Sequence, residues 1–462
     1  MSSPFNEEKY KQLLEGLEIS EINFSKLNND HRIDAEYFSK QNLIFQKKLL
    51  DYGIMRIGDI ATVTDGIHTS IDYDENSHIN LISATSPKDN VFDLSRSAYI
   101  SEKAHSENPR TALKKNDVII STVGTIGNCA VVDDSILPAN SDRHVGIIRI
   151  NTDYSPYVLS TFLLSKYGKT QTTRESTGNV QLNLFIYKLR ELCIPRFSET
   201  FQQTIEHIVK SAHANLSKSK SLYSEAEELL LKELGLKNWQ PNNTPVNIKQ
   251  LKDSFVASGR LDAEYYQQKY DELFSKLSMY DYDIVKDIAI IKKSVEPGSD
   301  AYQDRGIPFA RVSDVTKFGI LEPKIFLPPN EFSLNDLQPK KDTILLSKDG
   351  SVGIAYKVED DMDCITSGAL LHLSVFNKDY MPDYLTLVLN SIVVQMQAER
   401  DSNGAIIQHW KPSEIEQVII PKLQKPIQEA ISSKIQESFA LKAESKRLLD
   451  EAKMMVEMEI EA

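Results

Sequence analysis

Apolar residues alternate with polar ones at strand-like spacing in two long stretches of this chain. In residues 31–197 and 256–421, short β-rich runs are separated by turn residues; residues 118–121, 145–150 and 343–347 are examples. Such spacing predicts the strands of a twisted sheet, with a few helices between them. Each stretch is therefore predicted to be an α+β domain.

Helical spacing appears once within each of these stretches and once directly after it. A helix is predicted to follow Pro156 and another to follow Pro382. Residues 201–236 and 427–462 contain no proline and are rich in Glu, Lys, Ala and Leu, with apolar residues at heptad spacing. This composition predicts one long helix after each mixed domain.

Small residues recur in the apolar seams of the two long helices. Ser219 and Ala226 in the first seam align with Ser445 and Ala452 in the second. Because small seam residues allow close approach, we expect the two helices to pair as an antiparallel coiled coil with pseudo-twofold symmetry. The alternative is that each helix packs only on its own domain.

A duplication explains why the pattern occurs twice. The segment RIDAEYF at residues 32–38 returns as RLDAEYY at residues 260–266, and 260 minus 32 gives an offset of 228. STVGTIG at residues 121–127 matches SKDGSVG at residues 347–353 at an offset of 226. Units of this length are too long for solenoid repeats, so each copy is expected to fold with its own core.

The repeat sets the expected domain boundaries. Residues 13–17 (LLEGL) echo the end of the central helix at residues 230–236, so the N-terminal segment is expected to complete a circular repeat. The expected parts are an N-terminal segment (1–30), the first mixed domain (31–197), a central helix (198–236), a linker (237–255), the second mixed domain (256–421) and a C-terminal helix (422–462).

Composition narrows the class of protein. The 462 residues are 41% apolar and 26% charged, as in a globular protein, and no apolar run reaches the roughly 18 residues of a membrane span. The first residues lack the features of an export signal, so a cytoplasmic protein without membrane contact is expected. Three distant cysteines suit neither a disulfide framework nor a zinc site, and no metal is expected.

The net charge of -13 argues against a large basic surface. Residues 31–197 hold 19 basic and 19 acidic side chains, while residues 237–421 hold 20 basic and 27 acidic ones. Proteins that bind DNA gain much of their affinity from neutralising phosphates. A DNA-binding role would therefore require local basic patches or positive charge from a partner.

No catalytic motif is present. The chain lacks a nucleophile elbow, a phosphate loop ending in Gly-Lys-Ser/Thr, a His-Glu-x-x-His helix and a Cys-x-x-Cys pair. Asp34 and Glu36 are two residues apart, as are Asp262 and Glu264, which is a spacing open to acid–base chemistry. The neighbouring Arg32 offers a salt bridge, so a structural turn is the favoured interpretation.

Two loop families are candidates for binding. The first is Ser-x-x-Gly-x-x-Gly, in which glycines permit close backbone approach to phosphates or base edges. A tight structural hairpin explains the glycines equally well. The candidate side chains in this family are Thr122, Thr125, Lys348 and Ser351.

The second family is the polar stretch after Gly178 and after Gly404. Amide side chains bind adenine edges in the major groove, and the two copies carry different polar residues here. The candidates are Asn179 and Gln181 in one copy, and Gln408, His409 and Lys411 in the other. Further DNA-binding candidates are His68, Thr69 and Ser70, which differ from the matching residues 296–298, together with Arg311 and Ser313.

These motifs, in this order and present twice, resemble the specificity subunit of type I restriction-modification enzymes. The resemblance covers essentially the whole chain. It implies a non-catalytic subunit with two target recognition domains, each reading one half of a bipartite site in double-stranded DNA. It also implies that the helices set the spacer and dock two methyltransferase (M) subunits, and that restriction/translocase (R) subunits join the complex.

The same resemblance implies no cofactor in this chain, since S-adenosylmethionine is carried by the methyltransferase partners. Two alternatives remain open. One is a specificity subunit of a different methylation-based phage-defence system, because that difference lies in the partner. The other is a coiled-coil adaptor that does not bind DNA.

Overall fold

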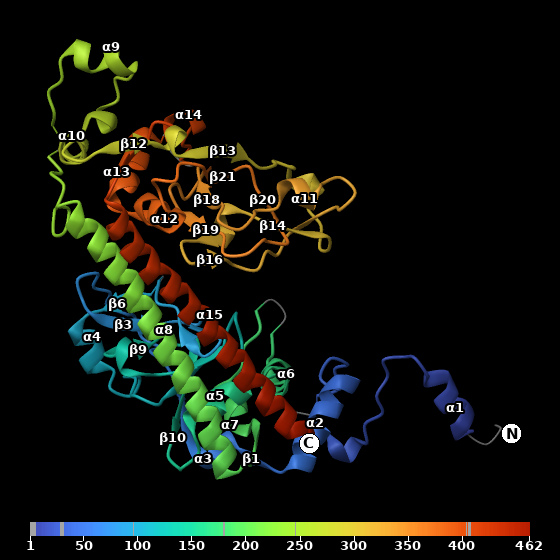
Figure 1. The fold of residues 1–462 in the computed structure, drawn as a ribbon. Helices are drawn as coiled ribbons and strands as arrows, with labels where there is room; N and C mark the ends of the chain where they lie inside the picture. Colours follow the sequence, from blue (N-terminus) through green and yellow to red (C-terminus); the bar gives the residue numbers. More distant parts are fainter. Residues whose placement is uncertain are drawn as a thin grey trace. The chain divides into compact units, whose positions relative to one another are not determined.

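The chain folds into two compact units, which are described separately. The computed structural model describes residues 6–27, 32–95, 97–178, 181–244, 246–402, 404 and 408–462 (Figure 1). Unit 1 comprises Met1–Leu216 and Ala443–Ala462, and unit 2 comprises Ser217–Lys442. Each unit thus combines one mixed domain with part of both long helices, while the domain boundaries proposed from the sequence stay a prediction.

Unit 1 contains short strands and helices in mixed order. Its helices are α1 (Glu7–Leu14), α2 (Lys40–Tyr52), α3 (Ile57–Ile60), α4 (Glu102–Glu107), α5 (Pro156–Leu164), α6 (Lys166–Glu175), α7 (Ile186–Glu191) and the first half of α8 (Glu199–Glu233). Its strands are β1 (Ile54–Arg56), β2 (Ala61–Asp65), β3 (Ile79–Ile82), β4 (Pro87–Lys88), β5 (Val91–Phe92), β6 (Ala98–Ile100), β7 (Val118–Ser121), β8 (Cys129–Val131), β9 (Ala139–Ser141), β10 (Val145–Ile150) and β11 (Cys193–Pro195).

Unit 2 repeats this series. Its helices are the second half of α8, α9 (Phe255–Ser258), α10 (Gln268–Leu277), α11 (Leu334–Leu337), α12 (Pro382–Asn390), α13 (Ile392–Asp401), α14 (Pro412–Ile415) and the first half of α15 (Lys425–Glu461). Its strands are β12 (Tyr282–Ile284), β13 (Ala289–Lys293), β14 (Ile307–Ala310), β15 (Val315–Thr316), β16 (Gly319–Ile320), β17 (Phe326–Leu327), β18 (Ile344–Ser347), β19 (Ala355–Lys357), β20 (Ile365–Thr366), β21 (Leu370–Val375) and β22 (Ile419–Pro421).

The main sheets of the two units have the same topology. Unit 1 has the antiparallel order β2-β10-β7-β8, and unit 2 has the order β13-β21-β18-β19. A smaller sheet follows the same plan, with β6-β3-β9 in unit 1 and β17-β14-β20 in unit 2. Each small sheet contains one parallel pair. The expectation of two tandem α+β domains is confirmed.

Each unit has its own hydrophobic core. In unit 1 the sheet residues Val118, Ile120 and Ile148 pack with Phe162 from α5 and Val209 from α8. All five are buried, and each such side chain contributes about 1.5–3 kcal/mol through its removal from water. The core of unit 2 is built the same way from β18, β21, α12, α13 and the long helices.

The helices predicted after Pro156 and Pro382 are each broken once. Helix α5 ends at Leu164 and α6 begins at Lys166, because Ser165 lies between them in an extended conformation and accepts a hydrogen bond from the Gly168 amide. Ser391 separates α12 from α13 in a similar extended conformation, but its hydroxyl donates to the Val388 carbonyl and does not cap α13. Serine at a helix start favours such breaks, and the apolar spacing alone did not reveal them.

The long helices form as predicted and pair with each other in each unit (Figure 1). In unit 2, Lys218 pairs with Glu437 at 2.6 Å, and Glu225, further along α8, pairs with Lys434 at 2.6 Å. Residue numbers therefore rise in one helix as they fall in the other, which makes the pair antiparallel. The buried Ser219 lies in this seam, with its hydroxyl 3.1 Å from that of Ser438.

In unit 1, residues Ile205 and Val209 of α8 share a core with Ala452, Val456 and Ile460 of α15. Each long helix thus packs against both the other helix and a mixed domain. The pseudo-twofold relation between the two copies stays a prediction. No helix among the described residues is long and apolar enough to cross a membrane.

Candidate nucleic-acid interface

Several loops of unit 1 meet at one end of its main sheet. Strand β7 ends at Ser121, which pairs with Val145 at the start of β10, and Asp65 at the end of β2 pairs with Gly146. The loops after β2, after β7 and before β10 therefore leave the sheet side by side. Unit 2 has the same arrangement, since Ser347 pairs with Leu370 and Lys293 pairs with Leu371.

The Ser-x-x-Gly-x-x-Gly segments are tight hairpins at this end of each sheet. Gly127 and Gly353 have φ values of +82° and +86°, a conformation that side chains disfavour. A Cβ on Gly127 would lie 2.7 Å from Thr172 Oγ1, and one on Gly353 would lie 2.7 Å from Gln395 Nε2. Hairpin geometry and close packing account for these glycines, so the motif by itself does not require a ligand.

The polar loop after Gly178 lies against the hairpin of unit 1. The Leu184 amide donates to the Thr122 carbonyl at 2.9 Å, and Asn183 forms a β-bridge with Val123. Thr177 and Asn183 exchange backbone hydrogen bonds of 2.8 and 2.9 Å, which close the loop at its base. The two loop families predicted from the sequence are therefore brought together.

In unit 2 the same two loops are in contact through their backbones, but their side chains differ. The Gly350 amide donates to the Gln408 carbonyl at 2.9 Å, and the Trp410 amide donates to the Lys348 carbonyl at 2.8 Å. His409 Nδ1 lies 2.8 Å from Asp349 Oδ1. The contact between the loops is thus common to both units, whereas the exposed chemistry differs.

The loop after β2 in unit 1 carries His68, Thr69 and Ser70. The Ile67 amide donates to the Ser141 carbonyl at 2.8 Å, which holds this loop beside β9. His68 Nε2 lies 2.6 Å from Asp65 Oδ2, and Thr69 and Ser70 are exposed. These three candidates lie at the same end of the sheet as the hairpin.

Arg311 and Ser313 follow β14 in unit 2. Ala310 accepts a hydrogen bond of 2.9 Å from the Ser367 amide, which precedes β21 and connects this segment to the same end of the sheet. Arg311 Nε is buried and lacks a hydrogen-bond partner within the described chain, and it lies 3.9 Å from the Asp314 carboxylate. Ser313 is exposed and hydrogen-bonds Asp314 at 3.2 Å.

The candidate side chains differ in exposure. Thr122 is only 5% exposed, and Lys348 is 8% exposed with its ammonium group paired with Asp349. Neither side chain points freely to solvent, although both belong to the predicted loops. The exposed candidates are His68, Thr69, Ser70, Thr125, Gln181, Ser313, Ser351, Gln408, His409 and Lys411. Asn179 lies outside the described residues, and direct contact with DNA stays a prediction for every candidate.

Several polar residues at this end of unit 1 were not predicted from the sequence motifs. Arg110 donates to the carbonyls of Asp65 and Gly66 at 2.9 and 3.1 Å, although it is more than 40 positions away in sequence. Arg143 and His144 occupy the turn before β10. Sequence motifs do not reveal that these residues are close, because only the sheet register brings them together.

Exposed aromatic residues follow the polar loop of unit 1 but have no aromatic counterpart at the matching positions of unit 2. Phe185 and Tyr187 are 50% and 57% exposed, and their rings stack with centroids 5.9 Å apart. At the offset of 226, Lys411 and Ser413 stand at the matching positions. The segment that follows the polar loop is therefore aromatic in unit 1 and polar in unit 2.

His372 is a buried residue of unit 2 whose contacts indicate a structural role. Its Nε2 lies 2.7 Å from the buried Thr366 hydroxyl, and burial lowers its pKa to about 4. The ring is therefore neutral at pH 7. Across the part of the chain that the structure describes, no group of three His, Cys, Asp or Glu residues has a geometry suited to a metal.

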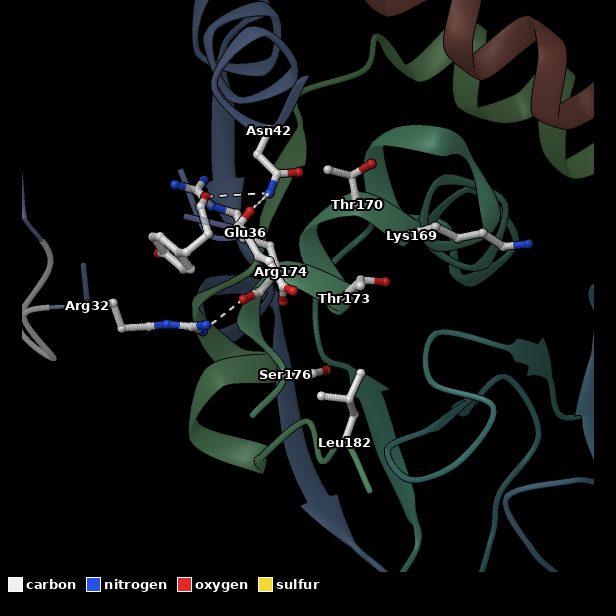
Figure 2. Close-up of a pocket in the computed structure, with 10 residues that line it drawn as sticks. Arg32, Glu36, Asn42, Lys169, Thr170, Thr173, Arg174, Ser176 and Leu182 are labelled. Carbon is white, nitrogen blue, oxygen red and sulfur yellow. Dashed lines mark hydrogen bonds between the residues drawn. The ribbon is translucent and has the colours of Figure 1, made fainter. Parts of the chain in front are cut away.

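A pocket of about 310 Å³ lies at the base of the polar loop in unit 1 (Figure 2). Arg32, Tyr37 and Arg174 line one part of it, and Leu182 from the loop lines another. Arg32 is part of the repeated RIDAEYF segment and pairs with Asp34 at 2.8 Å, which confirms the predicted salt bridge. Burial of the guanidinium is partial, and the hydrogen bond from Arg32 lowers the pKa of Asp34.

Two mixed units that each present paired loops at one end of a sheet, together with an antiparallel pair of long helices, define the architecture predicted for a specificity subunit. No family model matches the chain. A curated relative, the specificity subunit of the type I restriction enzyme EcoBI from Escherichia coli, is 23% identical over 236 residues. This match covers 50% of the chain and 42% of the relative's length. The resemblance predicted from the sequence is confirmed.

Solved structures with detectable similarity include two S subunits. The S subunit of a type I restriction-modification system from M. genitalium is 13% identical, with a TM-score of 0.42; the alignment covers 88% of this chain and 94% of that one. The HsdS subunit from Thermoanaerobacter tengcongensis is 15% identical, with a TM-score of 0.27 and coverage of 88% and 95%.

Proposed function

We propose that this chain is the DNA-recognition subunit of a type I restriction-modification complex, in which unit 1 and unit 2 each read one half of a bipartite target. The observation that carries the proposal is the pairing of two loops at the same end of the main sheet in both units. The backbone contacts of these loops match, while their exposed side chains differ. Such a design suits one mode of DNA docking with two different base sequences.

The side chains available for base contacts differ in kind. Unit 1 offers the amide of Gln181 and the hydroxyls of Thr69 and Ser70, whereas unit 2 offers Gln408 and Lys411. Amides pair bidentately with adenine, and lysine pairs with guanine. The two half-sites are therefore expected to differ in sequence.

The partners and chemistry of the complex belong to the same proposal. The chain itself acts without catalysis or cofactor and docks two methyltransferase subunits, which hold S-adenosylmethionine, as well as restriction subunits. This activity would be cytoplasmic. With a net charge of -13, the chain alone is expected to bind DNA weakly, and partners supply the missing positive charge.

Mapping of methylated adenines tests the proposal. The chain is expressed with the methyltransferase subunits of its own genome in a host without other adenine methylases, and methylated positions are mapped genome-wide. We expect one asymmetric bipartite motif with a fixed spacer. Absence of any sequence-specific methylation would refute a recognition role, and a perfect palindrome would refute different readout by the two units.

The helices are proposed to set the spacer. An insertion of one helical turn near Leu236 adds about 5.4 Å, which is comparable to one or two base pairs at about 3.4 Å each. The same methylation map should then show a changed gap between unchanged half-sites. An insertion that altered the bases themselves would contradict this division of roles.

A further inference from the structure

The repeated RIDAEYF and RLDAEYY segments make further contacts beside their arginine–aspartate salt bridges. In unit 1, the ring of Tyr37 lies between two guanidinium groups. Arg32 lies 4.5 Å from the ring centroid and Arg174 lies 4.0 Å from it. Tyr37 is buried, so these contacts form largely away from water, where a cation beside an aromatic ring is most favourable.

Hydrogen bonds fix the three residues relative to each other. Arg32 binds Asp34 through two nitrogens at 2.8 and 3.0 Å. It donates a third hydrogen bond to the Arg174 carbonyl at 2.9 Å (Figure 2). Arg174 in turn donates from Nε to the Tyr37 carbonyl at 2.8 Å. The segment from Arg32 to Tyr37 is thus bound to the last turn of α6.

The same network reaches both ends of the polar loop. The Tyr37 hydroxyl donates to Glu175 Oε1 at 2.8 Å, and the second carboxylate oxygen of Glu175 lies 3.2 Å from Lys188 Nζ. Glu175 is the last residue of α6, directly before the loop, and Lys188 lies in α7, directly after it. The loop between them is the one that carries Gln181.

Unit 2 repeats the central part of this network. Arg260 binds Asp262 at 2.9 and 2.5 Å and donates to the Asp401 carbonyl at 3.3 Å. Tyr265 lies between Arg260 at 4.4 Å and Arg400 at 4.9 Å. Asp401 is the last residue of α13, directly before the polar loop of unit 2.

A conserved arrangement at the same place in two copies with different loop residues indicates a shared task. Bidentate arginine contacts have strict geometry, so they hold a backbone in position more firmly than apolar packing does. The contacts reach the start of the loop in both units and its end in unit 1. None of these side chains needs to touch DNA to influence the loop.

We propose that the Arg-x-Asp-x-x-Tyr segment of each unit is a positioning clamp for the polar loop of that unit, and that the accuracy of base readout in one half-site depends on the clamp of one unit. This inference rests on the proposed DNA-recognition function. Arg32, Asp34 and Tyr37 act through Arg174 and Glu175 on the first loop. Arg260, Asp262 and Tyr265 act through Arg400 and Asp401 on the second.

Arg32→Lys and Arg260→Lys form a matched pair of variants. Lysine keeps the charge but cannot form the bidentate contact with the aspartate or place a planar guanidinium beside the tyrosine ring. Each complex is assembled with its methyltransferase subunits and incubated with S-adenosylmethionine and a library of random double-stranded DNA. Methylated molecules are then sequenced. Arg447→Lys, in an exposed ion pair on α15, is the control and should leave both half-sites unchanged.

Arg32→Lys should lower discrimination against single mismatches by about tenfold in one half-site only, and Arg260→Lys should do so in the other half-site. Tyr37→Phe keeps the ring and removes the hydrogen bond to Glu175, so it should reproduce the effect of Arg32→Lys more weakly. Thermal unfolding of each variant shows whether a loss reflects unfolding instead.

The outcomes separate the two levels of inference. A wild-type complex without sequence preference would refute the proposed function. If the wild type reads two half-sites and the clamp variants change neither, the clamp is refuted. Equal loss at both half-sites, or reduced methylation with unchanged discrimination, would show a purely structural role and would also refute it.

Discussion

The base of the polar loop in unit 1 and the corresponding base in unit 2 share a framework but differ in charge. In unit 1, Glu175 and Lys188 form an ion pair at 3.2 Å, with side chains that are 19% and 10% exposed. At the offset of 226, their counterparts in unit 2 are Asp401 and Glu414, which carry the same charge. In unit 2, Arg400 neutralises Asp401 instead, at 2.7 Å.

This difference shows how a duplicated domain keeps its geometry while its side chains diverge. The arginine and tyrosine of the repeated segment maintain the backbone position in both units, so the residues around them can change. Burial raises the pKa of Asp401, and the nearby negative charge of Glu414 raises it further, while Arg400 opposes both. Unit 2 therefore holds its loop base with an arginine–aspartate pair in which the pKa of the carboxyl group is raised, whereas unit 1 uses a glutamate–lysine pair.

The largest expected change in the free energy of unfolding comes from removing the buried apolar side chain next to the polar loop. Trp410 in unit 2 and Leu184 in unit 1 are both buried at matching positions. Trp410→Ala should lower the free energy of unfolding of unit 2 by about 3–5 kcal/mol, because it leaves a large cavity. Urea unfolding followed by the fluorescence of Trp239, which is also in unit 2, measures the change. Trp410→Leu, which copies unit 1, should cost less; equal cost would disprove the cavity explanation.

A charge reversal in unit 1 should have the next largest effect. Lys188→Glu places two carboxylates at the loop base, as in unit 2, but without the matching arginine contact to the first carboxylate. The free energy of unfolding of unit 1 should fall by about 2–3 kcal/mol, because Glu175 loses its lysine partner in a largely buried position. The variant is made in a Leu184→Trp background, in which the new tryptophan gives a fluorescence signal from unit 1 during denaturant unfolding. Lys188→Arg keeps the ion pair and serves as the control; unchanged stability of Lys188→Glu would contradict the importance of the pair.

A smaller effect is expected on the pH dependence of the stability of unit 2. A carboxyl group whose pKa is raised on folding stabilises the folded state most below its unfolded pKa, about 3.9 for aspartate, and this contribution is lost as pH rises through the raised value. Asp401→Asn should remove that part of the pH dependence. Urea midpoints, measured by tryptophan fluorescence between about pH 3 and pH 7, give the pH dependence of stability for the wild type and the variant. If both proteins showed the same dependence on pH, the contribution of Asp401 would be disproved.

The smallest effect is expected in the helix seam. Ser438 donates to the Ser219 carbonyl at 2.7 Å in unit 2, while Ala212 stands at the position of unit 1 that matches Ser438. Ser438→Ala copies unit 1 and should cost about 1 kcal/mol or less. Ser219→Leu is the contrasting variant, since overpacking the close helix contact should cost about 1–3 kcal/mol. Urea unfolding distinguishes the two, and a harmless Ser219→Leu would contradict close approach of the helices.

Some features of this protein follow from the sequence alone because they depend on local pattern. The long helices near residues 199–233 and 425–461 were predictable from their composition and heptads. The strands at residues 118–121 and 145–150 followed from apolar spacing, and the duplication followed from direct comparison. The motif order also identified both loop families, since glycine spacing is a local signal.

Other features depend on contacts between residues far apart in the chain, which no local pattern encodes. Only the fold shows that Thr122 and Lys348 are buried within predicted binding loops, that Arg110 joins the same end of the sheet, and that Tyr37 lies between two arginines. Local propensity decides which elements form, whereas sheet register and packing decide which side chains meet, because those contacts exist only once the chain has collapsed.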